Sequence, residues 1–227
     1  MFKIIDNNLS SYSFDKIQKI EHKLKDCEKT NMRGYVFGLH ETLDGKKELI
    51  DFNPNHIVLT GRKWLMQRAI NASMDETPQQ ANYYINWFGI GSGGTNSSDI
   101  MTPLYTPDQQ ESLNNPIKIY RSFQEGFKYS SDGYRKTFLK FDNKNAQMKY
   151  DNVNSEVVAL FHLILDFNDC PYEMPSLGVL INELALYASP SENEDETNYI
   201  MFSRYCLPSK YKTNRDRYTF IKIQVSM

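Results

Sequence analysis

The sequence has no excess of charge of either sign. Its 26 Lys and Arg residues against 28 Asp and Glu residues give a formal net charge of −2 at pH 7. General nucleic-acid binders carry a clear basic excess, and solvating tails carry an acidic block. The composition therefore supports neither class, and we expect no specific nucleic-acid partner.

Cysteine is scarce, and its spacing has no recognised pattern. Cys27, Cys170 and Cys206 show no C-x-x-C pair and cannot all pair with one another. A disulfide framework needs an even set of cysteines, and a zinc ribbon needs paired ones. We therefore expect neither kind of site, and no redox role.

Long apolar runs are also missing. Residues 1–18 lack the apolar core of a secretory signal peptide. The longest apolar stretch, residues 157–167, is about half of the roughly 20 residues that a membrane helix needs. It also contains His162 and Asp166. We expect a soluble protein in the cytosol of the producing cell, with no membrane partner.

Aromatic residues, by contrast, are plentiful. The 15 Tyr and 13 Phe residues favour strands, because aromatic side chains suit a half-buried pleated surface. Gly, Pro and Asn interrupt the strand candidates at irregular intervals, which favours an antiparallel β-sandwich over a βαβ sheet. The strand candidates are residues 35–39, 48–52, 83–90, 117–123, 134–141, 156–167, 177–187, 199–207 and 218–225.

Two helices are expected before the main run of strands. Ile17, Ile20 and Leu24 stand at helical spacing after the possible N-caps Ser13 and Asp15. A second helix is predicted over residues 56–72.

The predicted fold is therefore mainly β, an antiparallel β-sandwich with N-terminal helices. Residues 1–54 form an expected N-terminal arm with a helix and a hairpin, whose turn is Asp44-Gly45. Residues 55–227 form an expected domain in which a helix precedes the β-sandwich.

A glycine-rich segment follows the strand predicted over residues 83–90. Gly89, Gly91 and Gly94 match G-x-G-x-x-G, but a dinucleotide fingerprint needs a helix to begin there. The chain up to Pro116 has no helical periodicity, and no Gly-Lys-Ser/Thr follows. We interpret the segment as a turn in which glycine supplies positive φ and close backbone approach, and we expect no cofactor.

The four histidines give no sign of a metal site. His22, His40, His56 and His162 do not stand in the spacings that ligate zinc on one helix. His162 lies among apolar residues, which favours a buried histidine with satisfied hydrogen bonds. No metal is expected.

Glu183 is a carboxylate inside an apolar strand. Strict alternation places it opposite Asn182 and Leu184 and beside Ile181. A buried carboxylate serves as a general acid or base in some sites. It also serves to accept backbone N–H groups from a loop, or to pair with Arg204 or Arg62. We favour a structural polar role for Glu183 and the two arginines.

A basic patch follows near the C-terminus. Lys210, Lys212, Arg215 and Arg217 alternate with tyrosines such as Tyr211. Such interleaving binds single-stranded nucleic acid in some proteins, whereas Tyr and Arg also anchor protein interfaces. The net charge of −2 favours the interface.

Four segments, read in chain order, resemble the virion structural proteins of tailed bacteriophages that occupy the neck, tail and baseplate. That loose class has a T-x-R helix, a G-x-G loop followed by Asp and Pro, an N-E-x-G-L-(F/Y) strand and an S-R-x-x-(F/L)-P hairpin followed by K-T. The corresponding segments here are Thr60-Gly61-Arg62, residues 88–95 with Asp99 and Pro103, residues 182–187, and residues 203–208 with Lys212-Thr213. Ala185 stands where the pattern has Gly.

The resemblance covers about residues 55–227 and implies a β-sandwich subunit without catalysis. It implies a place in the virion, with assembly in the host cytoplasm, a homo-oligomeric ring and other virion proteins as partners. The residues expected at subunit interfaces are Gly89, Gly91, Gly93, Gly94, Asp99, Lys210, Tyr211, Lys212, Arg215 and Arg217.

Two other functions are consistent with the sequence. A host-facing carbohydrate-binding tail or fibre module would stack Trp87, Tyr83 or the tyrosine-rich loops on sugar rings. An enzyme would use Glu183 with a second acid such as Asp166 as an acid/base pair.

Overall fold

A computed structural model describes most of the chain from residue 32 onward. The described residues are 32–70, 83–104, 109–119, 126–138, 148–151, 156–170 and 178–226. Their strands, in chain order, are β1 (Met32–Thr42), β2 (Lys47–Ile57), β3 (Tyr84–Gly91), β4 (Thr95–Asn96), β5 (Asp99–Pro103), β6 (Pro116–Ile117), β7 (Lys136–Thr137), β8 (Met148–Asp151), β9 (Glu156–Leu165), β10 (Val179–Ser189), β11 (Ile200–Lys212) and β12 (Asp216–Ser226).

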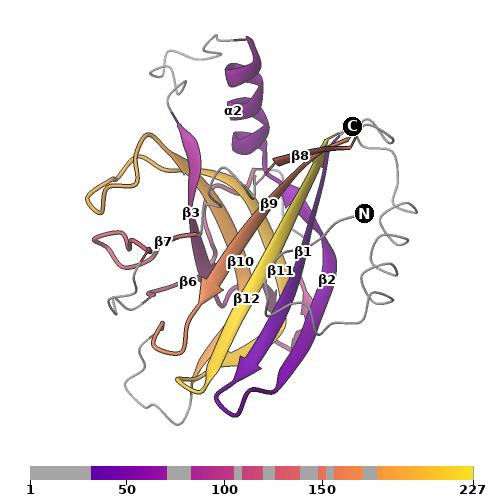
Figure 1. The fold of residues 1–227 in the computed structure, drawn as a ribbon, viewed down its shortest axis with the longest axis vertical. Coiled ribbons are helices and arrows are strands. Elements are labelled where there is room, and N and C mark those ends of the chain that lie inside the picture. The colour runs from indigo at the N-terminus through magenta and orange to yellow at the C-terminus, as the bar shows by residue number, and fades with distance from the viewer. Residues whose placement is uncertain are drawn as a thin grey trace.

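Ten of these strands form one antiparallel sheet that curls over on itself. The strand order is β6-β3-β10-β11-β2-β1-β12-β9-β8, with β7 beside β3. The last residues of β2, His56 and Ile57, pair with Arg204 and Ser203 of β11, while the rest of β2 pairs with β1. Because β2 serves both sides, it joins a "β1 half" (β1, β2, β12, β9, β8) to a "β10 half" (β3, β6, β7, β10, β11), as Figure 1 shows.

The two halves face each other across a shared hydrophobic core. Val36, Leu163 and Phe220 of the β1 half belong to the same buried cluster as Phe88 and Leu184 of the β10 half. Burying each such side chain contributes roughly 1.5–3 kcal/mol, so this shared core holds the sheet in its curled form. The predicted mainly β, antiparallel, sandwich-type fold is confirmed.

The predicted hairpin is present, and it lies inside the sheet. β1 and β2 are joined at Asp44-Gly45, where Gly45 has a φ of +80°, a value that glycine adopts without steric cost. β1 pairs along its full length with β12. The domain boundary that the sequence predicts after residue 54 therefore falls within β2.

Two predicted strands are much shorter than expected. Of residues 117–123 and 134–141, only Ile117 in β6 and Lys136–Thr137 in β7 are in strands among the residues that the structure describes; residues 120–123 and 139–141 lie outside them. A turn stabilised by Asp132, which accepts the amide of Tyr134, limits β7. The chain between the predicted strands 83–90 and 117–123, where no element was predicted, contains the hairpin of β4 and β5.

The second predicted helix is α2 (Leu59–Ile70), which packs against the start of β11. The Thr60 hydroxyl donates to the carbonyl of Met201 at 2.8 Å, and the Trp64 ring packs edge-on against Phe202. In the part of the chain that the structure describes, no helix has both the length and the apolar character needed to cross a membrane. The helix predicted from Ile17 onward lies outside the described residues.

Gly61 sets how closely α2 approaches β11, so we expect Gly61→Ala to destabilise the fold. A Cβ at this position would overlap the Phe202 carbonyl oxygen, and overpacking of this kind costs about 1–3 kcal/mol. Urea denaturation followed by circular dichroism measures the change. Leu59→Ala on the same helix, where the side chain is exposed, is the control and should change stability by less than about 0.5 kcal/mol. Equal effects in the two variants would contradict this account of the contact.

Candidate functional site

A fully buried ion pair lies at the centre of the β10 half. Glu183 of β10 and Arg204 of β11 stand on adjacent strands, and their side chains are 0% and 1% exposed. The Arg204 Nε and Nη2 groups both donate to Glu183 Oε2, at 3.0 and 2.5 Å. Because two buried charges are costly unless they are paired and hydrogen-bonded, the remaining bonds of this carboxylate decide whether the site is stable.

Those remaining bonds come from backbone amides of the glycine-rich segment and of the two residues before β6. Glu183 Oε1 accepts the amides of Gly93 at 2.9 Å and Asn115 at 3.0 Å. Its Oε2 accepts the amide of Asn114 at 3.2 Å. The carboxylate thus receives five donated hydrogen bonds and ties Gly93 and the pair Asn114-Asn115 to the sheet. Charge-assisted bonds of this type are about twice as strong as neutral ones.

Asn182 holds the same segment one residue further on. Its side-chain oxygen accepts the Gly94 amide at 2.7 Å, and its amide group donates to the hydroxyls of Thr95 and Ser209 at 2.8 and 3.1 Å. Strict alternation predicted that Asn182 and Glu183 face opposite ways. In the structure both side chains contact residues 93–95, Glu183 at the Gly93 amide and Asn182 at the Gly94 amide and the Thr95 hydroxyl. The pairing of β10 with β11 shifts register beside them, where β11 contributes the extra residues between Cys206 and Lys210.

The glycines of this segment are required for space. A Cβ at Gly91 would overlap the Glu183 carboxylate, and one at Gly94 would overlap the Asn182 carbonyl. Neither glycine has a positive φ, so of the two predicted reasons only close approach applies. After Gly94 the chain enters the β4–β5 hairpin, whereas a dinucleotide site needs a helix there.

Two other interface candidates of the segment differ in their exposure. Gly89 is buried, with Tyr187 and Tyr134 in the way of any side chain. Asp99 is exposed at the start of β5. Hydrogen bonds from the Thr102 hydroxyl and the Met101 amide hold the pKa of Asp99 below its usual value, and they stiffen the hairpin turn.

The predicted basic patch is divided between surface and interior. Lys212 is fully buried, and its Nζ donates to the carbonyls of Thr213 at 2.8 Å and Phe167 at 3.2 Å. Burial lowers the pKa of Lys212, and the two carbonyls satisfy hydrogen bonds of its Nζ inside the protein. Its predicted place at a subunit interface therefore does not fit the structure, because no part of the side chain reaches the surface.

The other members of the patch reach the surface to different degrees. Tyr211 is 59% exposed, and Arg215 is exposed in the β11–β12 turn. Lys210 and Arg217 are half-buried, and Arg217 Nε lies 3.6 Å from Asp166. These four residues form an accessible turn.

Of the two arginines proposed as partners of Glu183, the structure places Arg204 there. Arg62 instead extends from the exposed face of α2. Sequence reasoning missed the contribution of Asn182 and the second buried ion pair, between Lys136 and Asp169. A signal for the first was available, because Asn182 stands next to Glu183 as a second polar residue inside an apolar strand.

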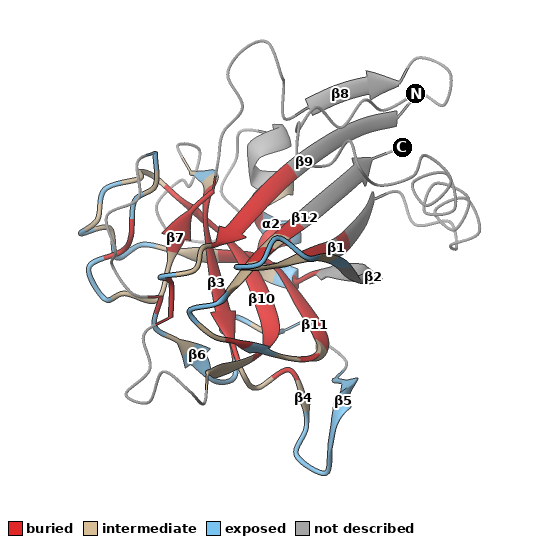
Figure 2. Cartoon of the chain, turned by 60° about the horizontal axis from the view of Figure 1, so that its bottom comes forward, coloured by how far each residue is buried: buried red, intermediate tan, exposed pale blue. Residues whose placement is uncertain are grey.

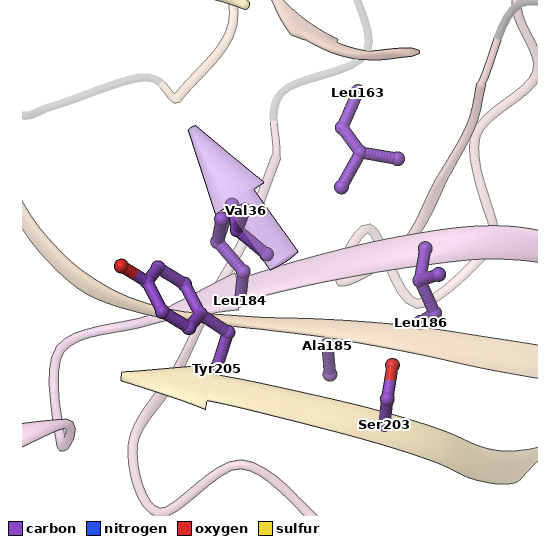
Figure 3. A pocket seen from close by; sticks show the side chains of 7 residues that line it. All are labelled: Val36, Leu163, Leu184, Ala185, Leu186, Ser203 and Tyr205. Carbon is purple, nitrogen blue, oxygen red and sulfur yellow. The ribbon is translucent and has the colours of Figure 1, made fainter. Parts of the chain in front are cut away.

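A small cavity lies beside the middle of β10. Figure 3 shows a cavity between the two halves, where Val36 and Leu163 face Leu184, Leu186 and Tyr205. Its volume of about 10 Å³ is at the lower limit for one water molecule. The cavity is therefore a packing gap between the halves.

The described ranges contain no candidate metal site, and the two cysteine thiols that they contain are buried. No group of three or more His, Cys, Asp and Glu residues there is close enough to hold a metal ion. His162 is buried in β9. Burial raises the pKa of the Cys170 thiol to about 12, so this thiol stays protonated and unreactive at neutral pH.

We expect Glu183→Gln to destabilise the protein strongly, although the shape of the side chain is kept. The substitution leaves the buried Arg204 guanidinium without its counter-charge, and breaking a buried pair in this way costs about 3–5 kcal/mol. Urea denaturation measures the loss. The exposed Glu111 provides the matched control Glu111→Gln, which should change stability by less than about 0.5 kcal/mol. A Glu183→Gln protein as stable as this control would show that the pair is dispensable.

Gly94→Ala should also destabilise the fold, by about 1–3 kcal/mol, because the new methyl group meets the Asn182 carbonyl. Ser97→Ala at the exposed tip of the same hairpin is its control. Thermal unfolding by circular dichroism compares the two. A lowered melting temperature in both, or in neither, would refute the requirement for close approach.

Comparison of the chain with models of protein families, with curated proteins and with solved structures finds no match.

Proposed function

We propose that this chain is a structural subunit of a tailed-bacteriophage virion, placed in a neck, tail or baseplate ring. In this proposal the hairpin of β4 and β5, with the Lys210–Arg217 turn, contacts neighbouring subunits. The proposal includes no catalytic step and no bound cofactor.

The observation that carries the proposal is the convergence of the four resembling segments on one buried network. Thr60 and Gly61 contact the strand β11 immediately before Ser203 and Arg204. Arg204 pairs with Glu183. The strand segment that begins at Asn182-Glu183 then binds the amides of the glycine-rich loop. Residues that are far apart in the sequence are thus used to build one rigid frame, which is what a structural subunit needs.

The hairpin of β4 and β5 is a suitable contact element. Every residue of β5 is exposed, and Figure 2 shows the hairpin extending from the body of the molecule. Ile100, Met101 and Leu104 are large apolar side chains exposed by 43%, 56% and 40%. Exposed apolar clusters of this kind mark protein contacts.

The hairpin is held at its base by the network described above. Gly94, directly before β4, donates to Asn182, and the hydroxyls of Thr95 and Ser209 lie 3.3 Å apart. β5 also packs along β11, the strand that carries the exposed Tyr211. The two segments predicted to form interfaces therefore adjoin each other on one side of the molecule.

The alternative functions receive less support from the site. Trp87 is fully buried, and its Nε1 donates to Ser189 and Ser191, so its ring offers no face to a sugar. Tyr83 packs against the core. Glu183, the candidate acid/base residue, has both oxygens engaged by five donors, and Asp166 lies near a different cation, Arg217.

Size-exclusion chromatography with light scattering, followed by negative-stain electron microscopy, tests the proposal. We expect a closed ring, or a monomer that binds to disassembled tailed-phage particles from the same source. A chain that stays monomeric at high concentration and binds to none of the particle proteins would overturn it.

Met101→Asp tests the contact element itself. A charge at this exposed position should abolish ring formation or binding to particle proteins, while the circular dichroism spectrum and melting temperature stay unchanged. Leu59→Asp, at an exposed apolar position at the start of α2, is the control and should assemble normally. Normal assembly of Met101→Asp would exclude the hairpin as the contact.

A further inference from the structure

A second buried ion pair lies outside the Glu183 network. Lys136 of β7 donates to Oδ2 of Asp169 at 2.5 Å, and both side chains are 0% exposed. Asp169 lies in the turn that follows β9, where its amide donates to the carbonyl of Asp166. The pair therefore connects the β10 half to the β1 half between residues that are 33 positions apart in the sequence.

Lys136 lies in a desolvated site lined by aromatic rings. Its Nζ lies 4.4 Å from the centre of the Phe127 ring and 5.2 Å from that of Tyr129. Burial lowers the pKa of Lys136, and this effect outweighs the opposing influence of Asp169 and Asp166. In an apolar site a charged pair is costly. In a reaction between the two groups, one proton moves along the short hydrogen bond between Nζ and Oδ2 and leaves a neutral amine and a neutral carboxylic acid. A neutral, desolvated lysine is a nucleophile.

Two further donors hold the carboxyl group of Asp169 in place beside this amine. The Tyr129 hydroxyl donates to Oδ1 at 2.8 Å, and the Asp166 amide donates to Oδ2 at 2.8 Å. The contact of 2.5 Å between Nζ and Oδ2 keeps the two reacting groups adjacent, and such proximity lowers the entropic cost of a reaction between them. The Tyr129 hydroxyl is positioned to stabilise negative charge that develops on Oδ1.

We propose that Lys136 and Asp169 condense to form an intramolecular amide bond, which links β7 covalently to the turn after β9. After the first proton transfer, Nζ attacks the carboxyl carbon and a C–N bond forms. A second proton then passes from Nζ to Oδ2, the bond between the carbon and Oδ2 breaks, and Oδ2 leaves as water. The ammonium and the carboxylate together become one amide and one water molecule, so no oxidant, reductant or further reactant is needed.

This bond would close a covalent loop across the two halves of the curled sheet. A cross-link between distant residues stabilises a fold mainly by restricting the unfolded chain. Unlike a disulfide, the amide would resist reducing agents. The proposal is independent of the proposed function, because it depends only on the surroundings of this pair.

Intact-protein mass spectrometry of the purified full-length chain, after incubation of the folded protein at neutral pH, tests the proposal directly. We expect a mass lower than the sequence mass by one water molecule. After trypsin digestion, tandem mass spectrometry should identify one branched peptide that joins the segments containing Lys136 and Asp169. The full sequence mass together with two separate peptides would overturn the proposal and leave the pair as an ion pair only.

Two variants locate the bond. Lys136→Arg keeps the positive charge but removes the amine, and it should have the full mass expected for its sequence. Lys118→Arg makes the same substitution at an exposed lysine and should still lose one water. If Lys136→Arg also lost water, the bond would involve another residue and this assignment would be wrong. The wild-type measurement decides the proposal even if Lys136→Arg fails to fold.

Discussion

The carboxylate of Glu183 is the constraint on which the β10 half depends. An ionised group with no exposed surface must find its hydrogen bonds inside the protein, and here the guanidinium of Arg204 and three loop amides supply them. Each donor fixes a different part of the chain. Arg204 fixes the register of β11 against β10, and the amides fix a segment of the chain that the sheet would otherwise not hold. One charge therefore organises elements that local sequence preferences leave undetermined.

Other buried polar groups follow the same rule. Lys136 and Asp169 pair without exposure to solvent, and Lys212, the last residue of β11, donates to the carbonyls of Phe167 and Thr213. These groups lie where short strands and turns meet, at places where backbone pairing ends. At these places, hydrogen bonds of buried charged groups hold the chain in position where the hydrogen bonds between strands end.

The sequence predicted the long elements well, because their hydrophobic patterns are set locally. The hairpin at Asp44-Gly45, α2 and the strands from β9 to β12 fall close to their predicted positions. The lengths of β6 and β7 were overestimated, since apolar content alone does not show where a neighbouring strand ends. The sequence indicated the importance of Glu183, because a charged residue stands inside an apolar strand. The sequence did not indicate that Glu183 pairs with Arg204 and not with Arg62, because the partner depends on which strand lies next to β10.

The anchoring of the β4–β5 hairpin also has a consequence for quality control. Its base is attached to Asn182 and Glu183, so the hairpin takes its shape only after β10 and β11 have paired in the correct register. A chain with a slipped register would leave the carboxylate unsatisfied and the hairpin unformed. In the proposed ring, the surface that contacts a neighbouring subunit would thus form only when the interior of the subunit is correctly folded. Incorporation would select correctly folded copies without a separate proofreading factor.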